Sequence, residues 1–162
     1  MRKLARQIAF LLIYSSDMGQ TNPQAVLDYY LDDKENLEDF LDAANILSIF
    51  PELDEDTLES ALSDDDKAFI SGTVSGTLEN KMDIDNLINA QAKRWSTLRM
   101  MSADKNILRM GVYELCYAPE KTPAGIVINE AVELAKIYGD DESYKFVNGI
   151  LDGIRKKADA DE

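Results

Sequence analysis

The side chains best suited to chemistry are cations and aromatic rings near the beginning of the chain. Lys3, Arg6, Phe10 and Tyr14 recur every three or four residues, and Arg2 adds a third cation. In a helix these four lie within about 80° of one another. Cations neutralise phosphates and rings stack on bases, as in many proteins that hold single-stranded RNA. The pattern alone favours the ordinary alternative, in which Phe10 is a core residue, Tyr14 lies at the boundary and the cations are solvated.

A second, weaker cluster combines the same residue types much later in the chain. Tyr144, Lys145 and Phe146 follow one another at the start of the last predicted helix. The backbone amides at a helix N-terminus also favour anions. Helix packing is the simpler explanation for this cluster when it is considered by itself.

Catalysis and metal binding find little support among the residue types. The chain has no histidine, which removes the commonest general base and metal ligand, and Cys116 is its single cysteine. We find no phosphate-binding glycine loop, zinc-ligand spacing or glycine-flanked serine. The run from Asp64 to Asp66 lacks the spacing of a calcium loop and suits the first turn of a helix. We therefore expect a protein that is not an enzyme, with no cofactor and no metal.

The elements that must position these residues are predicted to be helices. Apolar residues recur at spacings of three and four, and sustained strand-like alternation is absent from the sequence. Asn22-Pro23 marks a helix start, Phe50-Pro51 a helix end, and Ser63 with Asp66 a capping box. Gly72 and Gly76, four residues apart, predict a close helix contact. The expected helices cover about residues 3–18, 23–32, 36–49, 57–62, 63–80, 102–118 and 123–138, with a last helix that begins at about 143. A further helix begins at Asp83, and its apolar side chains form one stripe through Ile84, Leu87, Ile88 and Trp95.

Length and charge complete this outline. The 162 residues suit one domain, which we divide into an N-terminal helical subdomain of about residues 1–80 and a C-terminal one of about 81–158. The net charge is −14, and residues 20–66 hold 15 carboxylates against Lys34 alone. The rest of the chain is close to neutral and can present a basic face. The apolar run at 9–14 is too short for a signal peptide or membrane span, so we expect a cytoplasmic protein with no membrane partner.

Several segments together resemble the NusB family of bacterial transcription antitermination factors. The resemblance is strong over about residues 95–151, moderate over 1–19 and weak over 20–66. It depends on Trp95-Ser96 with Arg99, the stretch from Arg2 to Arg6 with Tyr14, and three longer segments. Those segments are Ile107-Leu108-Arg109 with Tyr113-Glu114-Leu115, Pro123 with Ile128-Asn129-Glu130-Ala131-Val132-Glu133-Leu134-Ala135-Lys136, and Lys145-Phe146-Val147-Asn148-Gly149-Ile150-Leu151.

The resemblance implies an all-α bundle of two packed helical subdomains. It also implies binding of the boxA element of nascent RNA together with NusE, a small-subunit ribosomal protein, within RNA polymerase antitermination complexes. The RNA-binding residues that it implies all belong to the two clusters described above: Arg2, Lys3, Arg6, Tyr14, Lys145 and Phe146. This agreement raises the RNA hypothesis above the ordinary alternative.

The acidity of residues 20–66 leaves other hypotheses open. Affinity for RNA comes largely from cations, so we expect binding here to depend strongly on NusE. The main alternative is a helical protein-interaction adaptor of NusB fold with little RNA affinity, whose acidic segment serves a basic protein. A third is the RNA-binding module of an RNA methyltransferase, for whose catalytic domain this chain leaves no room.

Overall fold

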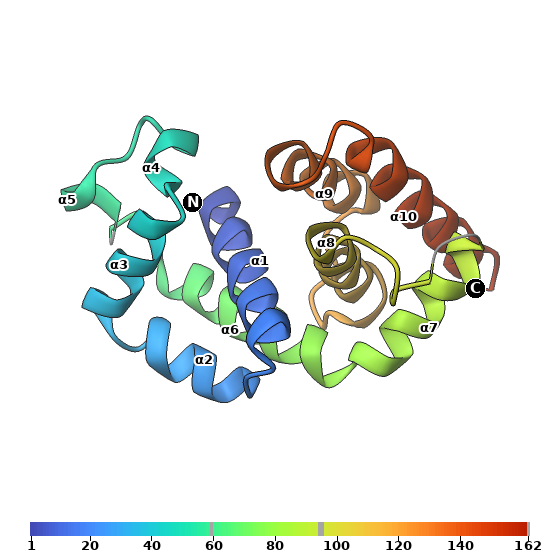
Figure 1. Ribbon diagram of the computed structural model, residues 1–162, viewed down its shortest axis with the longest axis horizontal. Helices are drawn as coiled ribbons and strands as arrows, with labels where there is room; N and C mark the ends of the chain where they lie inside the picture. Colours follow the sequence, from blue (N-terminus) through green and yellow to red (C-terminus); the bar gives the residue numbers. More distant parts are fainter. Residues whose placement is uncertain (59, 94–95, 162) are drawn as a thin grey trace. The chain divides into compact units, whose positions relative to one another are not determined.

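The chain folds into helices joined by short connections, as predicted (Figure 1). A computed structural model describes residues 1–58, 60–93 and 96–161, and these residues contain no strand. They form two compact units, Met1–Ser75 and Gly76–Glu162, and the division falls inside one helix. No helix in these ranges has the length and apolar content needed to cross a membrane.

The first unit is built from short helices whose starts are encoded locally. The side chain of Asn22 accepts the amide N–H groups of Gln24 and Ala25 at 2.9 and 3.4 Å, which confirms the predicted start at Pro23. The capping box is also confirmed: Asp66 N–H donates to Ser63 Oγ at 3.0 Å, and Ser63 N–H donates to Asp66 at 3.3 Å. The helices are α1 (Arg2–Gly19), α2 (Pro23–Tyr30), α3 (Lys34–Ala43), α4 (Ile46–Ile49), α5 (Glu55–Leu58) and α6 (Asp64–Glu79), the last of which continues into the second unit.

The single helix predicted over about 36–49 is wrong. Asn45 adopts a left-handed backbone with φ 56°, which ends α3 and separates it from α4. Asparagine tolerates this conformation better than most residues. The start is also earlier than predicted, because the Asp33 side chain accepts Asn36 N–H at 3.0 Å and caps α3. The chain therefore turns where the apolar spacing indicated a continuous helix.

In the described residues, four α-helices that lie wholly within the second unit pack against one another. In Figure 1, α9 and α10 lie side by side, and both contact α8. The elements are α7 (Lys81–Ala92), α8 (Ser102–Val112), a π-helix η1 (Tyr113–Tyr117), α9 (Ala124–Tyr138) and α10 (Ser143–Ala160). Their buried faces carry aliphatic side chains such as Ile107, Leu134 and Leu151. Burial of these side chains holds the unit together.

Helix α7 differs from its predicted outline. It begins at Lys81 after Asn80, so Asp83 lies within its first turn and does not precede it. Ile84 and Ile88 are fully buried as predicted, whereas Leu87 is 39% exposed. Trp95, the expected end of this stripe, lies outside the described residues.

A buried ion pair joins α7 to α8. Arg109 is 3% exposed, and its Nε and Nη2 groups each donate to one Asp85 oxygen at 2.8 Å. Its Nη1 group donates to Asn106 at 3.1 Å. Removing one partner of such a pair leaves an unpaired charge in the interior. We therefore assign this ion pair a role in the stability of the fold.

Only one of the two glycines in α6 lies at a close contact. A Cβ atom at Gly76 would lie 2.5 Å from Cζ of Tyr113, whereas one at Gly72 would have no neighbour within 4 Å among the described residues. The predicted close approach is therefore confirmed at Gly76 and wrong at Gly72. The close contact at Gly76 is made with the aromatic ring of Tyr113 in η1.

Candidate nucleic-acid interface

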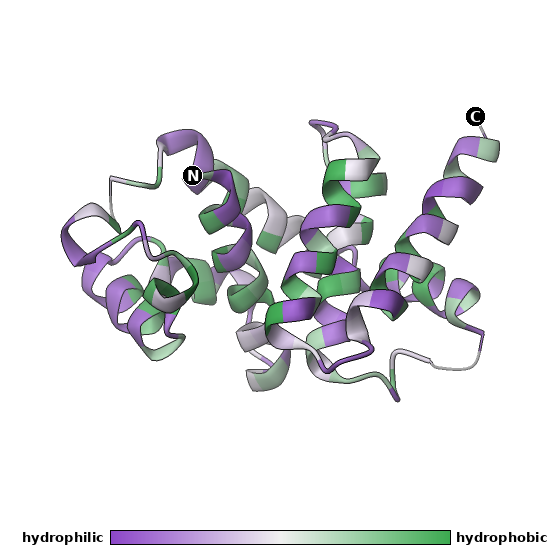
Figure 2. Ribbon diagram, turned by 90° about the horizontal axis from the view of Figure 1, so that it is seen from above, coloured by the Kyte–Doolittle hydropathy of each residue, from purple (hydrophilic) through white to green (hydrophobic). Residues whose placement is uncertain are grey.

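The predicted cationic and aromatic face of α1 is not one exposed stripe. Every residue from Leu4 to Phe10 is buried, with Phe10 1% and Arg6 4% exposed. Phe10 therefore belongs to the interior, and its ring lies 6.0 Å from the half-buried ring of Tyr14. Arg2 and Lys3 remain exposed at the start of the helix. Figure 2 shows this hydrophilic start in purple beside the N-terminus.

Arg2 is held in place by two partners on α6. Its Nε donates to Asp66 at 3.1 Å, and its guanidinium carbon lies 4.3 Å from the centre of the Phe69 ring. The side chain is still 46% exposed. A guanidinium has five N–H donors, and within the described part of the chain the four on the Nη atoms have no protein acceptor. Arg2 therefore combines a fixed position with donors suited to a phosphate.

Phe69 is the residue in this region that sequence reasoning missed. Its ring also lies 5.2 Å from the guanidinium carbon of Arg6, so one ring faces two arginines. Each cation–π contact stabilises the arrangement by about 0.5–1 kcal/mol where the groups are exposed. Helical spacing within α1 carries no information about a ring on α6, which explains the omission.

Asp66 supplies the negative charge that anchors this cluster. Its side chain is only 7% exposed, and it pairs with Arg2 and with the Met1 ammonium at 2.8 Å. Burial disfavours the charged form, but hydrogen bonds from the Met1 ammonium, Ser63 and Arg2 outweigh burial and lower the pKa of Asp66 to about 2. The carboxylate therefore remains charged over the whole physiological range.

The later cluster lies in the second unit, on α9 and α10. Lys145 is 63% exposed and makes a 3.7 Å ion pair with Glu142, which is weak because it is solvated. The ring of Tyr144 lies 5.8 Å from the Lys145 ammonium and 5.6 Å from that of Lys136. Phe146 is half-buried. Lys136 thus joins the predicted residues, a contact that depends on the packing of α9 against α10.

The first amides of α10 already have an acceptor. Asp140 Oδ1 accepts the N–H groups of Glu142 and Ser143 at 2.9 and 3.0 Å. A phosphate at this helix end would meet that carboxylate, which opposes the expected attraction of these amides for an anion. The attraction for an anion in this cluster comes from Lys136 and Lys145.

Other candidate chemistry is sparse in the ranges that the structure describes. They contain no group of three or more cysteine, aspartate and glutamate side chains that could hold a metal. Cys116 is half-buried, and burial raises the pKa of its thiol, which lowers its reactivity. The cationic and aromatic groups are therefore the features with a binding chemistry.

Comparison with known proteins identifies the family. The sequence profile described as the NusB family matches residues 3–156. The chain belongs to the NusB family. It is similar to the transcription antitermination protein NusB of Elusimicrobium minutum, with 38% identity over 156 residues, covering 96% of this chain and 94% of that protein. The NusB of Geobacter sp. strain M21 is 36% identical over 153 residues, covering 94% and 92%.

Solved NusB structures share the fold. The crystal structure of T. maritima NusB matches with a TM-score of 0.68 and 30% identity, covering 97% of this chain and 92% of that one. A crystal structure of the antitermination factors NusB and NusE in complex with double-stranded RNA matches with a TM-score of 0.69 and 28% identity, covering 96% of each chain. The all-α NusB fold is therefore confirmed.

Proposed function

We propose that this chain is a non-catalytic transcription antitermination factor that binds boxA-type single-stranded RNA together with NusE. In this role it joins RNA polymerase elongation complexes. The relatives named as antitermination proteins and the solved NusB–NusE–RNA complex support the general role. The observation that carries the RNA part is Arg2, whose side chain is fixed by Asp66 and Phe69 while its terminal N–H groups face no protein acceptor in the described ranges.

The proposed RNA contacts are Arg2, Lys3, Tyr14, Lys145 and Phe146. Arg2, Lys3 and Lys145 are exposed cations, and the rings of Tyr14 and Phe146 are half-buried with part of their surface accessible. Cations of this kind bind phosphates and rings of this kind stack on bases. Arg6 is the remaining residue of the six predicted, and its side chain is only 4% exposed. We assign it an indirect role, because it contacts the same Phe69 ring as Arg2.

Dependence on NusE follows from the charge of the chain. The net charge is −14, and 15 of the carboxylates lie within residues 20–66. This charge repels phosphate over about 8 Å at physiological ionic strength. A bound basic partner offsets that repulsion and adds its own cations, so RNA affinity is expected to rise strongly when NusE is present.

The test is a fluorescence anisotropy titration of a boxA-type RNA with and without NusE. Arg2→Gln is expected to weaken binding to the NusE-bound protein and to reduce the slope of log affinity against log salt by about 1. Lys121→Gln, which removes an exposed cation from the loop before α9, serves as the matched control and should change neither quantity. Equal affinity with and without NusE contradicts the dependence. Absence of binding in both conditions contradicts the RNA role and favours the adaptor.

A further inference from the structure

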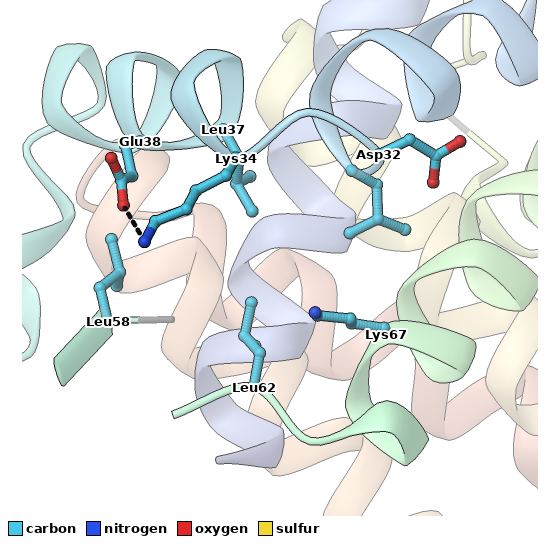
Figure 3. A pocket seen from close by; sticks show the side chains of 8 residues that line it. Asp32, Lys34, Leu37, Glu38, Leu58, Leu62 and Lys67 are labelled. Atoms are coloured by element: carbon cyan, nitrogen blue, oxygen red, sulfur yellow. Dashed lines mark ion pairs between the residues drawn. The ribbon is translucent and has the colours of Figure 1, made fainter. Parts of the chain in front are cut away.

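The acidic part of the first unit contains a groove lined by aliphatic and charged side chains. One cavity of about 170 Å³ lies between α3 and the chain around Leu58 and Leu62, with Leu37 and Lys34 on the α3 side (Figure 3). A second cavity, of about 190 Å³, is lined by Leu41, Ile46 and Leu47. Both cavities are also lined by Glu38 and Leu58, so they are neighbours. We call this pair of cavities the α3 groove.

The size and spacing of the cavities set the shape of an occupant. A cavity of about 150 Å³ with aliphatic walls holds a benzene-sized group, so each cavity has room for one aliphatic side chain. The first cavity is lined by Lys34, Leu37 and Glu38 of α3, and the second by residues from Glu38 to Asp42. Their centres are offset by about four residues along α3, or roughly 6 Å at the helical rise. Two aliphatic side chains one helical turn apart match that spacing.

Charge differs between the two ends of the groove. At the first cavity, Lys34 and Lys67 balance Asp32 and Glu38. At the second, the charged residues are all carboxylates: Glu38, Asp39, Asp42 and Glu55. Within the described ranges, the side chains of Asp39, Asp42 and Glu55 make no hydrogen bond or ion pair, and Glu38 meets Lys34 only at 3.8 Å. Four carboxylates thus line the second cavity beside four apolar side chains, and lysine or arginine is not among the described residues that line it.

We propose that the α3 groove docks a helical segment of a basic partner protein. Two aliphatic side chains four residues apart enter the cavities, and arginine or lysine side chains one turn further on pair with Asp39, Asp42 and Glu55. The aliphatic stem of arginine or lysine also covers apolar surface while its charged end meets the carboxylates. RNA does not fit this surface, because its phosphates would face the acidic rim. None of the residues that line the groove is among those proposed to bind RNA.

The test uses a 15-residue acetylated helical peptide of alanine and lysine, with leucines four residues apart followed by two arginines one turn on. Isothermal titration calorimetry gives its affinity, and methyl NMR of the full chain locates it. Binding is expected to shift the methyl resonances of Leu37, Leu41, Leu47 and Leu58. A peptide with both leucines changed to serine, and one with every cation changed to glutamate, are each expected to bind at least tenfold more weakly.

A charge-matched pair of protein variants completes the test. Asp39→Lys with Asp42→Lys reverses the rim and is expected to weaken the peptide at least tenfold. Glu52→Lys with Asp56→Lys makes the same change in net charge at exposed positions outside the groove, and should weaken it less than threefold. Circular dichroism confirms that both variants fold. Equal losses in the two variants, undiminished binding of the serine peptide, no binding of the leucine peptide, or shifts of these methyls by boxA-type RNA alone would each overturn the proposal.

Discussion

The guanidinium carbon of Arg2 lies 4.3 Å from the centre of the Phe69 ring. This contact joins the first turn of α1 to the first half of α6, across more than sixty residues of sequence. Together with the Arg2–Asp66 ion pair, it turns a long flexible side chain into a group with a defined position. The ordering costs side-chain entropy in the free protein, so less is lost when a phosphate binds.

Phe69→Leu should therefore weaken RNA binding without changing the net charge of the protein. The variant keeps an apolar side chain but loses the ring that faces Arg2 and Arg6. We expect the affinity of the NusE-bound protein for boxA-type RNA to fall about two- to fivefold, the equivalent of about 0.5–1 kcal/mol for an exposed cation–π contact. The salt slope should stay the same. Phe69→Tyr, which keeps a ring, is the control, and an equal loss in that variant would argue against the role of the ring.

Asp66→Asn should destabilise the fold at neutral pH. The folded pKa of Asp66 is about 2, below the ordinary value of 3.8, so its charged form stabilises the native state. The contribution of the ionised carboxylate to the free energy of unfolding is at most about 2 kcal/mol. It is fully present above about pH 4 and is lost as the pH falls towards 2. Urea unfolding should show a deficit near this size at pH 7 that shrinks by pH 2.5. Asp65→Asn, in the same helical turn but exposed, should lose less than 1 kcal/mol at either pH.

The contribution of Asp104 to the stability of the fold should show the opposite dependence on pH. Burial raises the pKa of this carboxyl, and Asp140 adds to the rise although Ser143 opposes it. Among the described residues its Oδ1 atom has no hydrogen-bond partner. The charged form therefore costs stability, a cost that is absent below about pH 3.8 and grows as the pH rises through the folded pKa.

The test of this dependence is Asp104→Asn, whose free energy of unfolding relative to the wild type should be higher at pH 7 than at pH 4. Chemical denaturation at the two pH values gives the comparison. The exposed Asp141→Asn should show no such difference. A relative stability that falls between pH 4 and pH 7 would contradict the assignment.

The two glycines of α6 provide a matched pair. Gly76→Ala should destabilise the protein by about 1–3 kcal/mol, because the new methyl group would lie 2.7 Å from the Tyr113 hydroxyl and force the ring to move. In the part of the chain that the structure describes, the new methyl group of Gly72→Ala meets nothing within 4 Å. This variant should stabilise the protein by up to about 1 kcal/mol, since alanine is the better helix former. Thermal unfolding of both variants decides the question. Equal shifts in melting temperature would count against the close contact with η1.

Lys136→Gln tests a contact that helical spacing within α10 could not indicate. Its ammonium shares the Tyr144 ring with that of Lys145. We expect weaker RNA binding and a reduced salt slope, of the size produced by Lys145→Gln. Lys156→Gln, at the far end of α10, provides the control. If the Lys136 variant matches this control, the second RNA-binding cluster is limited to α10.

Much of the fold follows from interactions between residues close in sequence. The start of α2 at Pro23 and the capping box of Ser63 and Asp66 were predictable, because each depends on hydrogen bonds within three residues. The all-α class was predictable for a related reason, since apolar residues at helical spacing have one way to form a buried stripe. The break at Asn45 was not, because the periodicity of α3 continues through it.

The candidate interface shows where local information ends. The residue types alone indicated cations and rings at both ends of the chain, since phosphates and bases call for those groups. The burial of Phe10 and Arg6, the contact of two arginines with the Phe69 ring, and the approach of Lys136 to Tyr144 were decided by tertiary packing. The sequence of a helix determines which side chains share a face, but whether that face is buried depends on elements from elsewhere in the chain.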